Sequence, residues 1–113
     1  KLTDKIISIK KDYWIDIHEL RFWQSGDRVF IDFHLILPYF FNIKQTHEEE
    51  ALIRKELQKD FARADLKIHL DYCISDLCKF CNYDECKVRV ETKSKTFVWD
   101  QNKLVGDPIY KIN

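Results

Sequence analysis

The sequence predicts an α+β fold in which helices cover one side of a small open sheet. Three observations support this. Apolar residues recur at helical spacing in residues 3–13 and 46–63, and they alternate strictly with other residues along 29–37. Turn signals at Ser25-Gly26-Asp27 and at Pro38 separate these segments. Elements in the order α-β-β-α-β can pack as two layers around one core, which is an open sandwich.

The first half of the chain predicts a helix followed by a β-hairpin. Apolar side chains line one side of the helix over residues 3–13. Residues 13–23 are rich in the aromatic and β-branched side chains that are typical of a strand. After the Ser25-Gly26-Asp27 turn, residues 29–37 form a second strand with one wholly apolar face, and Pro38 ends it.

The second half predicts a longer helix, a third strand and an added hairpin. Thr46 with Glu49 matches a capping box, in which each side chain satisfies a free backbone N–H of the other residue, and so opens the second helix. Residues 66–72 alternate between an apolar face and a polar face, as expected of a third strand. Residues 87–91 and 96–99 flank a short polar turn and predict a C-terminal β-hairpin.

Composition narrows the class of protein. The 113 residues suit a single domain, and a 45% apolar fraction provides for a packed core. The 19 basic and 19 acidic residues cancel, which weighs against a nucleic-acid partner, because that affinity depends on Lys and Arg neutralising phosphates. The sequence has neither a signal-peptide pattern nor an apolar run near the roughly 20 residues that cross a bilayer. Since it begins at Lys1 without Met, we expect a soluble fragment of a longer protein that does not itself insert into the membrane.

Two predicted strands each carry a histidine and a carboxylate on one face. His34 and Asp32 share the polar register of the second strand, while the other register is apolar. His69 and Asp71 are two residues apart on the third strand and so project side by side. The His69 imidazole and the Asp71 carboxylate in this arrangement supply two of the four ligands that zinc usually takes.

The other two histidines also suit metal binding. His18 lies in the first strand beside Glu19, and His47 follows the predicted cap of the second helix. A helix N-terminus disfavours imidazolium, which would keep His47 neutral, and the neutral form is the ligand. Taken singly, any one of these histidines is more often a solvated strand or cap residue than a metal ligand. Spacing alone therefore leaves a shared metal site and a set of surface histidines both open.

Four cysteines fall within 14 residues, in the spacing Cys-x4-Cys-x2-Cys-x4-Cys: Cys73, Cys78, Cys81 and Cys86. The inner Cys-x2-Cys pair has the chelating spacing of structural zinc sites, and soft thiolates suit Zn²⁺ or Cu⁺. Disulfides are the alternative for a secreted mini-protein, but this chain has enough apolar residues to fold without them and shows no export signal. Reduced loop cysteines and a role at a dimer interface also stay open.

Read in order, these residues resemble the C-terminal cytoplasmic domain of the cation diffusion facilitator (cation efflux) transporters. The resemblance rests on four segments and covers about residues 3–72: His18-Glu19-Leu20-Arg21 after a short helix, Val29-Phe30-Ile31-Asp32-Phe33-His34 in a strand, Thr46-His47 at a helix start, and His69-Leu70-Asp71 closing the third strand. It implies a ferredoxin-like αββαβ open sandwich, here with the added C-terminal hairpin. Residues 1–72 would form this domain, and residues 73–113 a Cys-rich segment and hairpin packed on it.

The resemblance also implies a function. The chain would be the regulatory and dimerisation domain of a divalent-cation efflux transporter, with zinc as the metal, and not an enzyme. It would homodimerise at the cytoplasmic face of the membrane, below its own N-terminal transmembrane domain, and bias that domain through metal binding near the dimer interface. The ligands implied by position are His18, His34, His47, His69 and Asp71, with Asp71 able to bridge two ions.

Two other functions compete with this one. A free-standing ferredoxin-like metallochaperone or redox module would use the Cys cluster and leave the histidines on the surface. A purely structural dimerisation domain would use the aromatic run of Tyr39, Phe40 and Phe41. An enzyme is disfavoured, because no nucleophile–base pattern is apparent and two glycines are too few for a phosphate-binding loop.

Overall fold

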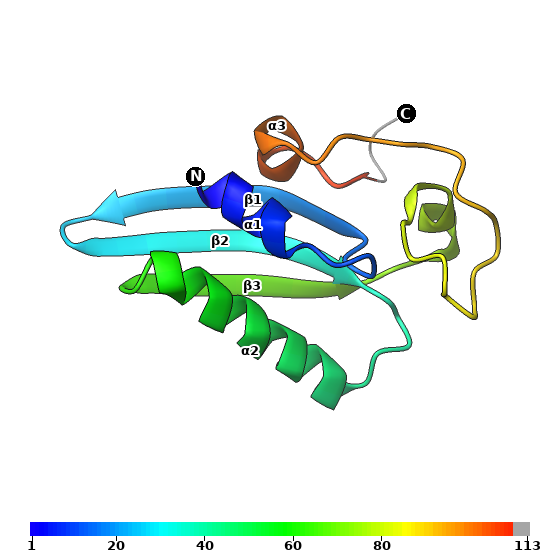
Figure 1. The fold of residues 1–113 in the computed structure, drawn as a ribbon, viewed down its shortest axis with the longest axis horizontal. Coiled ribbons are helices and arrows are strands. Elements are labelled where there is room, and N and C mark those ends of the chain that lie inside the picture. Colours follow the sequence, from blue (N-terminus) through cyan, green and yellow to red (C-terminus); the bar gives the residue numbers. More distant parts are fainter. Residues whose placement is uncertain (110–113) are drawn as a thin grey trace.

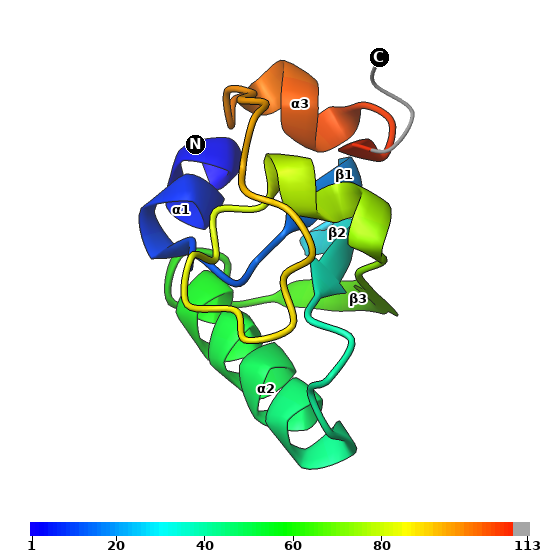
Figure 2. The same ribbon diagram turned by 90° about the vertical axis from the view of Figure 1, so that its right-hand side faces the viewer.

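The computed structural model describes residues 1–109 and confirms the α+β fold. Three strands form one sheet in the order β1-β2-β3, with β1 at Asp16–Ser25, β2 at Arg28–Leu37 and β3 at Ala64–Tyr72. The β1–β2 pair is antiparallel and the β2–β3 pair is parallel (Figure 1). Helices α1 (Leu2–Ile9) and α2 (Ile43–Asp60) lie together on one face of the sheet (Figure 2).

The chain beyond β3 wraps the end and the outer edge of the sheet. A 3₁₀ helix, η1 (Ser75–Phe80), lies past the end of β3, and a short helix, α3 (Gln101–Val105), lies along β1 (Figures 1 and 2). The first half of the edge strand β1 is thereby covered, and the Glu19 N–H and the Ile17 carbonyl there bond to Gly106 and Lys103. Among the helices of residues 1–109, none combines the length and the apolarity needed to cross a bilayer.

Buried apolar side chains of residues 1–109 form two clusters. The larger lies between the sheet and the helices α1 and α2, and it also takes in Leu104 of α3. The smaller lies at the end of the sheet under η1 and consists of Ile15, Ile36, Leu77, Phe80, Cys81 and Ile109. Residues late in the chain therefore complete both clusters.

The predicted C-terminal hairpin is wrong, because residues 87–99 contain no strand. The alternating valines of this segment, Val88, Val90 and Val98, are exposed, so their alternation does not mark a buried face. The Arg89 guanidinium instead donates to the carbonyls of Cys78, Cys81 and Tyr83 at 2.9–3.0 Å. The bonds that this arginine donates thus tie the segment to residues 78–83, whereas a hairpin would have bonded residues 87–91 to residues 96–99.

The structure also corrects two helix boundaries. The capping box of α2 is Asn42 with Gln45, whose side chains and backbone N–H groups bond reciprocally at 2.7 and 2.9 Å. Thr46, the predicted cap, lies inside the first turn, and its hydroxyl donates to the Asn42 carbonyl. The first helix ends at Ile9 and not near residue 13. The predicted turn is confirmed, with Gly26 at a φ of +63° that suits glycine.

Two leucines of α2 test this packing. Leu57 is 0% exposed in the core and Leu52 is 38% exposed on the same helix. We expect Leu57→Ala to lower the free energy of unfolding by about 2–5 kcal/mol, because it removes buried methyl groups and leaves a cavity. Leu52→Ala, with the same change in helix propensity, should lower it by no more than about 1 kcal/mol. Urea denaturation of both variants measures the difference, and equal losses would contradict the assigned face of α2.

Candidate metal centre

Three histidines form a row across the sheet. The backbone register places His18 opposite His34 on β1 and β2, and His34 opposite His69 on β2 and β3. Their rings stack, with centroids 5.1 Å apart for the first pair and 4.4 Å for the second. Because neighbouring residues such as Phe33 pack in the core beneath α1 and α2, the histidines lie on the opposite face. We call these three side chains the histidine row.

Two carboxylates complete the donor set around the histidine row. Glu19 Oε2 lies 3.9 Å from Nε2 of both His18 and His34. Asp32 Oδ1 lies 3.1 Å from Nε2 of His69. Within residues 1–109, two groups of three donors have all their ligand atoms within 4.8 Å of one another: His18, Glu19 and His34, and Asp32, His34 and His69. Both groups contain His34, and imidazole with carboxylate is a donor set that fits zinc.

A β-bulge places Glu19 beside the imidazoles. The β1–β2 register shifts between His18 and Arg21, so that Glu19 and Leu20 together face one residue of β2. Glu19 has a φ of 54°, in the left-handed region that a non-glycine residue seldom adopts. The extra residue turns Leu20 into the core and leaves the Glu19 carboxylate near the histidines. Strict alternation would have sent Glu19 to the core face.

The orientation of His18 is fixed by a buried carboxylate. Asp16 is 0% exposed, and its Oδ2 lies 3.0 Å from Nδ1 of His18. Burial alone would raise the pKa of Asp16, but hydrogen bonds from His18 and Lys103, with the Lys103 charge, outweigh it and hold that pKa below its usual range. An ionised carboxylate only accepts hydrogen bonds, so His18 Nδ1 must donate, which leaves Nε2 free as a ligand atom.

The central imidazole is kept neutral. The pKa of His34 lies below its ordinary value, first because burial disfavours the cation and then because positive charge on His69 or His18 would repel it. Metal ions bind the deprotonated imidazole nitrogen, so protons compete less for this residue at neutral pH.

Three of the five ligands predicted from the sequence are brought together, and two are not. His47 is exposed in the second turn of α2, and Asp71 accepts a hydrogen bond from the Tyr72 backbone at 2.8 Å. Neither belongs to a donor group among the residues that the structure describes. Asp16 was missed, and Asp32 and Glu19 were noted beside histidines but not as ligands. The available signal was spacing, since Asp16 and Asp32 each precede a histidine by two residues.

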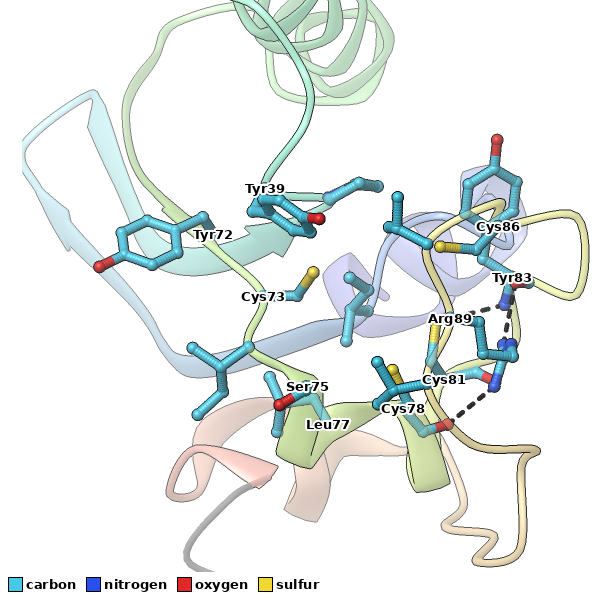
Figure 3. Close-up of a pocket in the computed structure, with 15 residues that line it drawn as sticks. Tyr39, Tyr72, Cys73, Ser75, Leu77, Cys78, Cys81, Tyr83, Cys86 and Arg89 are labelled. Carbon is cyan, nitrogen blue, oxygen red and sulfur yellow. Dashed lines mark hydrogen bonds between the residues drawn. The ribbon is translucent and has the colours of Figure 1, made fainter.

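The four cysteines line one cavity beyond the end of the sheet. Its volume is about 410 Å³, and Figure 3 shows the thiols of Cys73, Cys78, Cys81 and Cys86 around it. All four are free, and no three cysteine sulfurs of residues 1–109 lie within 4.8 Å of one another, so a closed tetrathiolate is not preformed. Burial raises the pKa of the Cys73 thiol, and charge on the other three cysteines would raise it further.

Comparisons with known proteins place the fold. A family model described as "Cation efflux protein, cytoplasmic domain" matches residues 3–73. The metal-bound C-terminal domain of the CzcD transporter from Thermotoga maritima is 22% identical with a TM-score of 0.55, and the match covers 63% of this chain and 81% of that one. The putative zinc transporter CzrB in its zinc form is 21% identical with a TM-score of 0.50, and the match covers 63% and 75%. A second structure of CzrB is 20% identical with a TM-score of 0.51, and the match covers 65% of this chain and 84% of that one. The curated proteins gave no significant match.

The bulge conformation is testable at Glu19. A β-branched residue at its φ of 54° is strongly disfavoured, whereas asparagine tolerates the left-handed region. We expect Glu19→Val to lower the free energy of unfolding by about 1–2 kcal/mol relative to Glu19→Asn. Both variants remove the carboxylate, so the comparison isolates the backbone. Urea denaturation in the presence of a chelator measures it, and equal stability of the two would show that residue 19 is not left-handed.

Proposed function

This chain belongs to the cation efflux protein cytoplasmic domain family, and we propose that it is the regulatory and dimerisation part of a divalent-cation efflux transporter that binds zinc on the histidine row. The observation that carries the proposal is the alignment of three imidazoles and two carboxylates on one sheet face. The names of the related CzcD and CzrB domains, which include metal-bound and zinc forms, support the choice of metal.

The donor set explains how zinc would be held. Each group of three donors leaves one position of a tetrahedral ion to be filled. Asp71 lies two residues from His69 on the same strand, and its two carboxylate oxygens could serve two ions. His47, which the family resemblance adds, would have to reach the site by rearrangement or from a second protomer. Zinc would act as an effector by favouring one arrangement of the protomers over others.

The aromatic run after β2 supplies a surface for the second protomer. Tyr39 is 55% and Phe40 is 42% exposed, and their rings meet edge to face. Phe41 instead packs on Tyr13 at 5.4 Å and belongs to the core edge. The proposed dimer contact therefore uses Tyr39 and Phe40 and leaves Phe41 to support them.

His34 gives the sharpest test of zinc binding, because both donor groups share it. We expect His34→Ala to weaken zinc binding by more than about 100-fold, since loss of a ligand exceeds the 10–100-fold effect of losing an outer-shell partner. Isothermal calorimetry with zinc measures the affinity. His47→Ala is the matched control, and its smaller expected loss reports what α2 contributes. A His34→Ala protein that binds zinc as tightly as the wild type would rule out the histidine row.

A second site is proposed in the cysteine cavity, because four thiols face one space. Burial raises the pKa of the Cys81 thiol and outweighs the opposing hydrogen bond that the Tyr83 backbone N–H donates to Cys81 Sγ at 3.4 Å, so this thiol keeps its proton until a metal displaces it. The three bonds from Arg89 to the surrounding carbonyls hold this loop in place. A thiophilic ion such as Zn²⁺ or Cu⁺ would draw the sulfurs together and displace the thiol protons.

Cobalt(II) separates the two sites, because sulfur ligation gives a charge-transfer absorption that imidazole and carboxylate do not. We expect this absorption in the wild type and in His34→Ala, and its loss in Cys78→Ser/Cys81→Ser. A wild type that never shows this absorption would exclude a cysteine metal site, and absorption that persists in the double serine variant would exclude Cys78 and Cys81 as its ligands.

A further inference from the structure

The C-terminal segment of residues 100–109 lies outside the family match and is anchored on the strand that carries His18. The Glu19 backbone N–H donates to the Gly106 carbonyl at 2.9 Å, and the Arg21 guanidinium donates to the Val105 carbonyl at 2.8 Å. Leu104 and Ile109 are both 0% exposed. The segment therefore docks on β1 through one backbone–backbone bond, one bond from the Arg21 side chain and two buried apolar anchors.

The same segment supplies two of the three donors to Asp16. Lys103 is buried, and its Nζ donates to Asp16 Oδ1 at 2.5 Å and to the Ile17 carbonyl at 3.0 Å. The Ile109 backbone N–H donates to Asp16 Oδ2 at 2.8 Å. The third donor is His18 Nδ1. Asp16 thus joins residues 103 and 109 to the first imidazole of the histidine row.

This arrangement controls the ligand atom of His18. A carboxylate behind a histidine fixes the ring orientation and the tautomer, and it raises the basicity of the nitrogen that binds metal. Asp16 keeps this position because both of its carboxylate oxygens accept hydrogen bonds from the segment. Lys103 donates to Oδ1, and the Ile109 N–H donates to Oδ2. Neither Lys103 nor Asp16 belongs to a donor group among residues 1–109, and Asp16 contacts His18 at Nδ1, so both act on metal binding through His18.

We propose that residues 100–109 are a clamp that holds His18 in its metal-binding orientation, so that docking of this segment and zinc binding at the histidine row are coupled. The inference rests on the proposed function of the row. Lys103 and Asp16 are positioning residues of the clamp. The chain beyond the family domain thereby becomes a second place at which zinc occupancy can be adjusted.

Coupling of this kind is reciprocal. If the docked clamp tightens zinc binding by some factor, then bound zinc stabilises the docked clamp by the same factor. Two amides report docking directly, because the Glu19 N–H bonds to the Gly106 carbonyl and the Ile109 N–H bonds to Asp16. Hydrogen exchange on the unmodified chain should therefore slow at both amides when zinc is added. The Phe61 amide at the end of α2 should stay unchanged.

A shape-matched pair of variants separates positioning from stability. Asp16→Leu/Lys103→Met removes both charges of the buried pair together and keeps similar side-chain shapes, so no unpaired charge is left buried. It does leave the Ile109 N–H and the Ile17 carbonyl without these partners, so some loss of stability is expected and Leu57→Ala controls for it. We expect the dissociation constant of the Leu/Met variant for zinc to rise by about 10–100-fold, because His18 loses its Nδ1 partner. Asp16→Asn/Lys103→Met should recover part of that affinity, since the amide oxygen still accepts from Nδ1. Leu57→Ala, which lowers stability away from the clamp, should bind zinc as the wild type does.

Specific outcomes would overturn the clamp. It fails if the Leu/Met variant binds zinc as tightly as the wild type, if the Asn/Met variant recovers nothing, or if Leu57→Ala shows the same loss. It also fails if zinc leaves exchange at Glu19 and Ile109 unchanged while His34→Ala abolishes binding. Zinc binding that is insensitive to His34→Ala would instead remove the proposed function, and the clamp with it.

Discussion

The carboxylate of Asp16 is fully buried, and donors from three separate parts of the chain satisfy it. An ionised carboxylate taken out of water costs several kcal/mol unless donors replace the lost hydration. His18, Lys103 and Ile109 provide those donors, from β1, from α3 and from the chain that follows α3. The hydrogen bonds that satisfy Asp16 therefore fix two things together: the docking of the C-terminal segment and the orientation of the His18 imidazole.

One face of the sheet packs against helices, and the other carries the candidate metal ligands. Helices α1 and α2 cover the apolar face, and the opposite face carries the histidine row. A slip of one residue between β2 and β3 would turn His69 into the core, so the buried apolar face also enforces the alignment of the imidazoles. The bulge at Glu19 adds a carboxylate that regular alternation would have buried. Stability and the site thus depend on the same register.

The sequence could predict the elements whose pattern is local. Strict alternation identified β2, His69-Leu70-Asp71 fell on β3 as expected, and the family resemblance over about residues 3–72 agrees with the matched residues 3–73. Patterns that depend on distant contacts were not predictable. Val88 and Val90 alternate with Arg89 as in a strand, but the Arg89 side chain donates hydrogen bonds to backbone carbonyls of a neighbouring loop, and no strand forms. The Lys103–Asp16 pair joins positions 87 residues apart, and no local signal announces it.

The central claim is that zinc binds on the histidine row with His18 held through Asp16. A crystal of the chain grown with zinc, measured on both sides of the zinc absorption edge, would locate the ion directly. We predict an anomalous peak in contact with Nε2 of His18 or His69 and with the His34 ring, with His18 Nδ1 still bonded to Asp16. Zinc found only among the cysteines, with the three imidazoles free, would contradict the account.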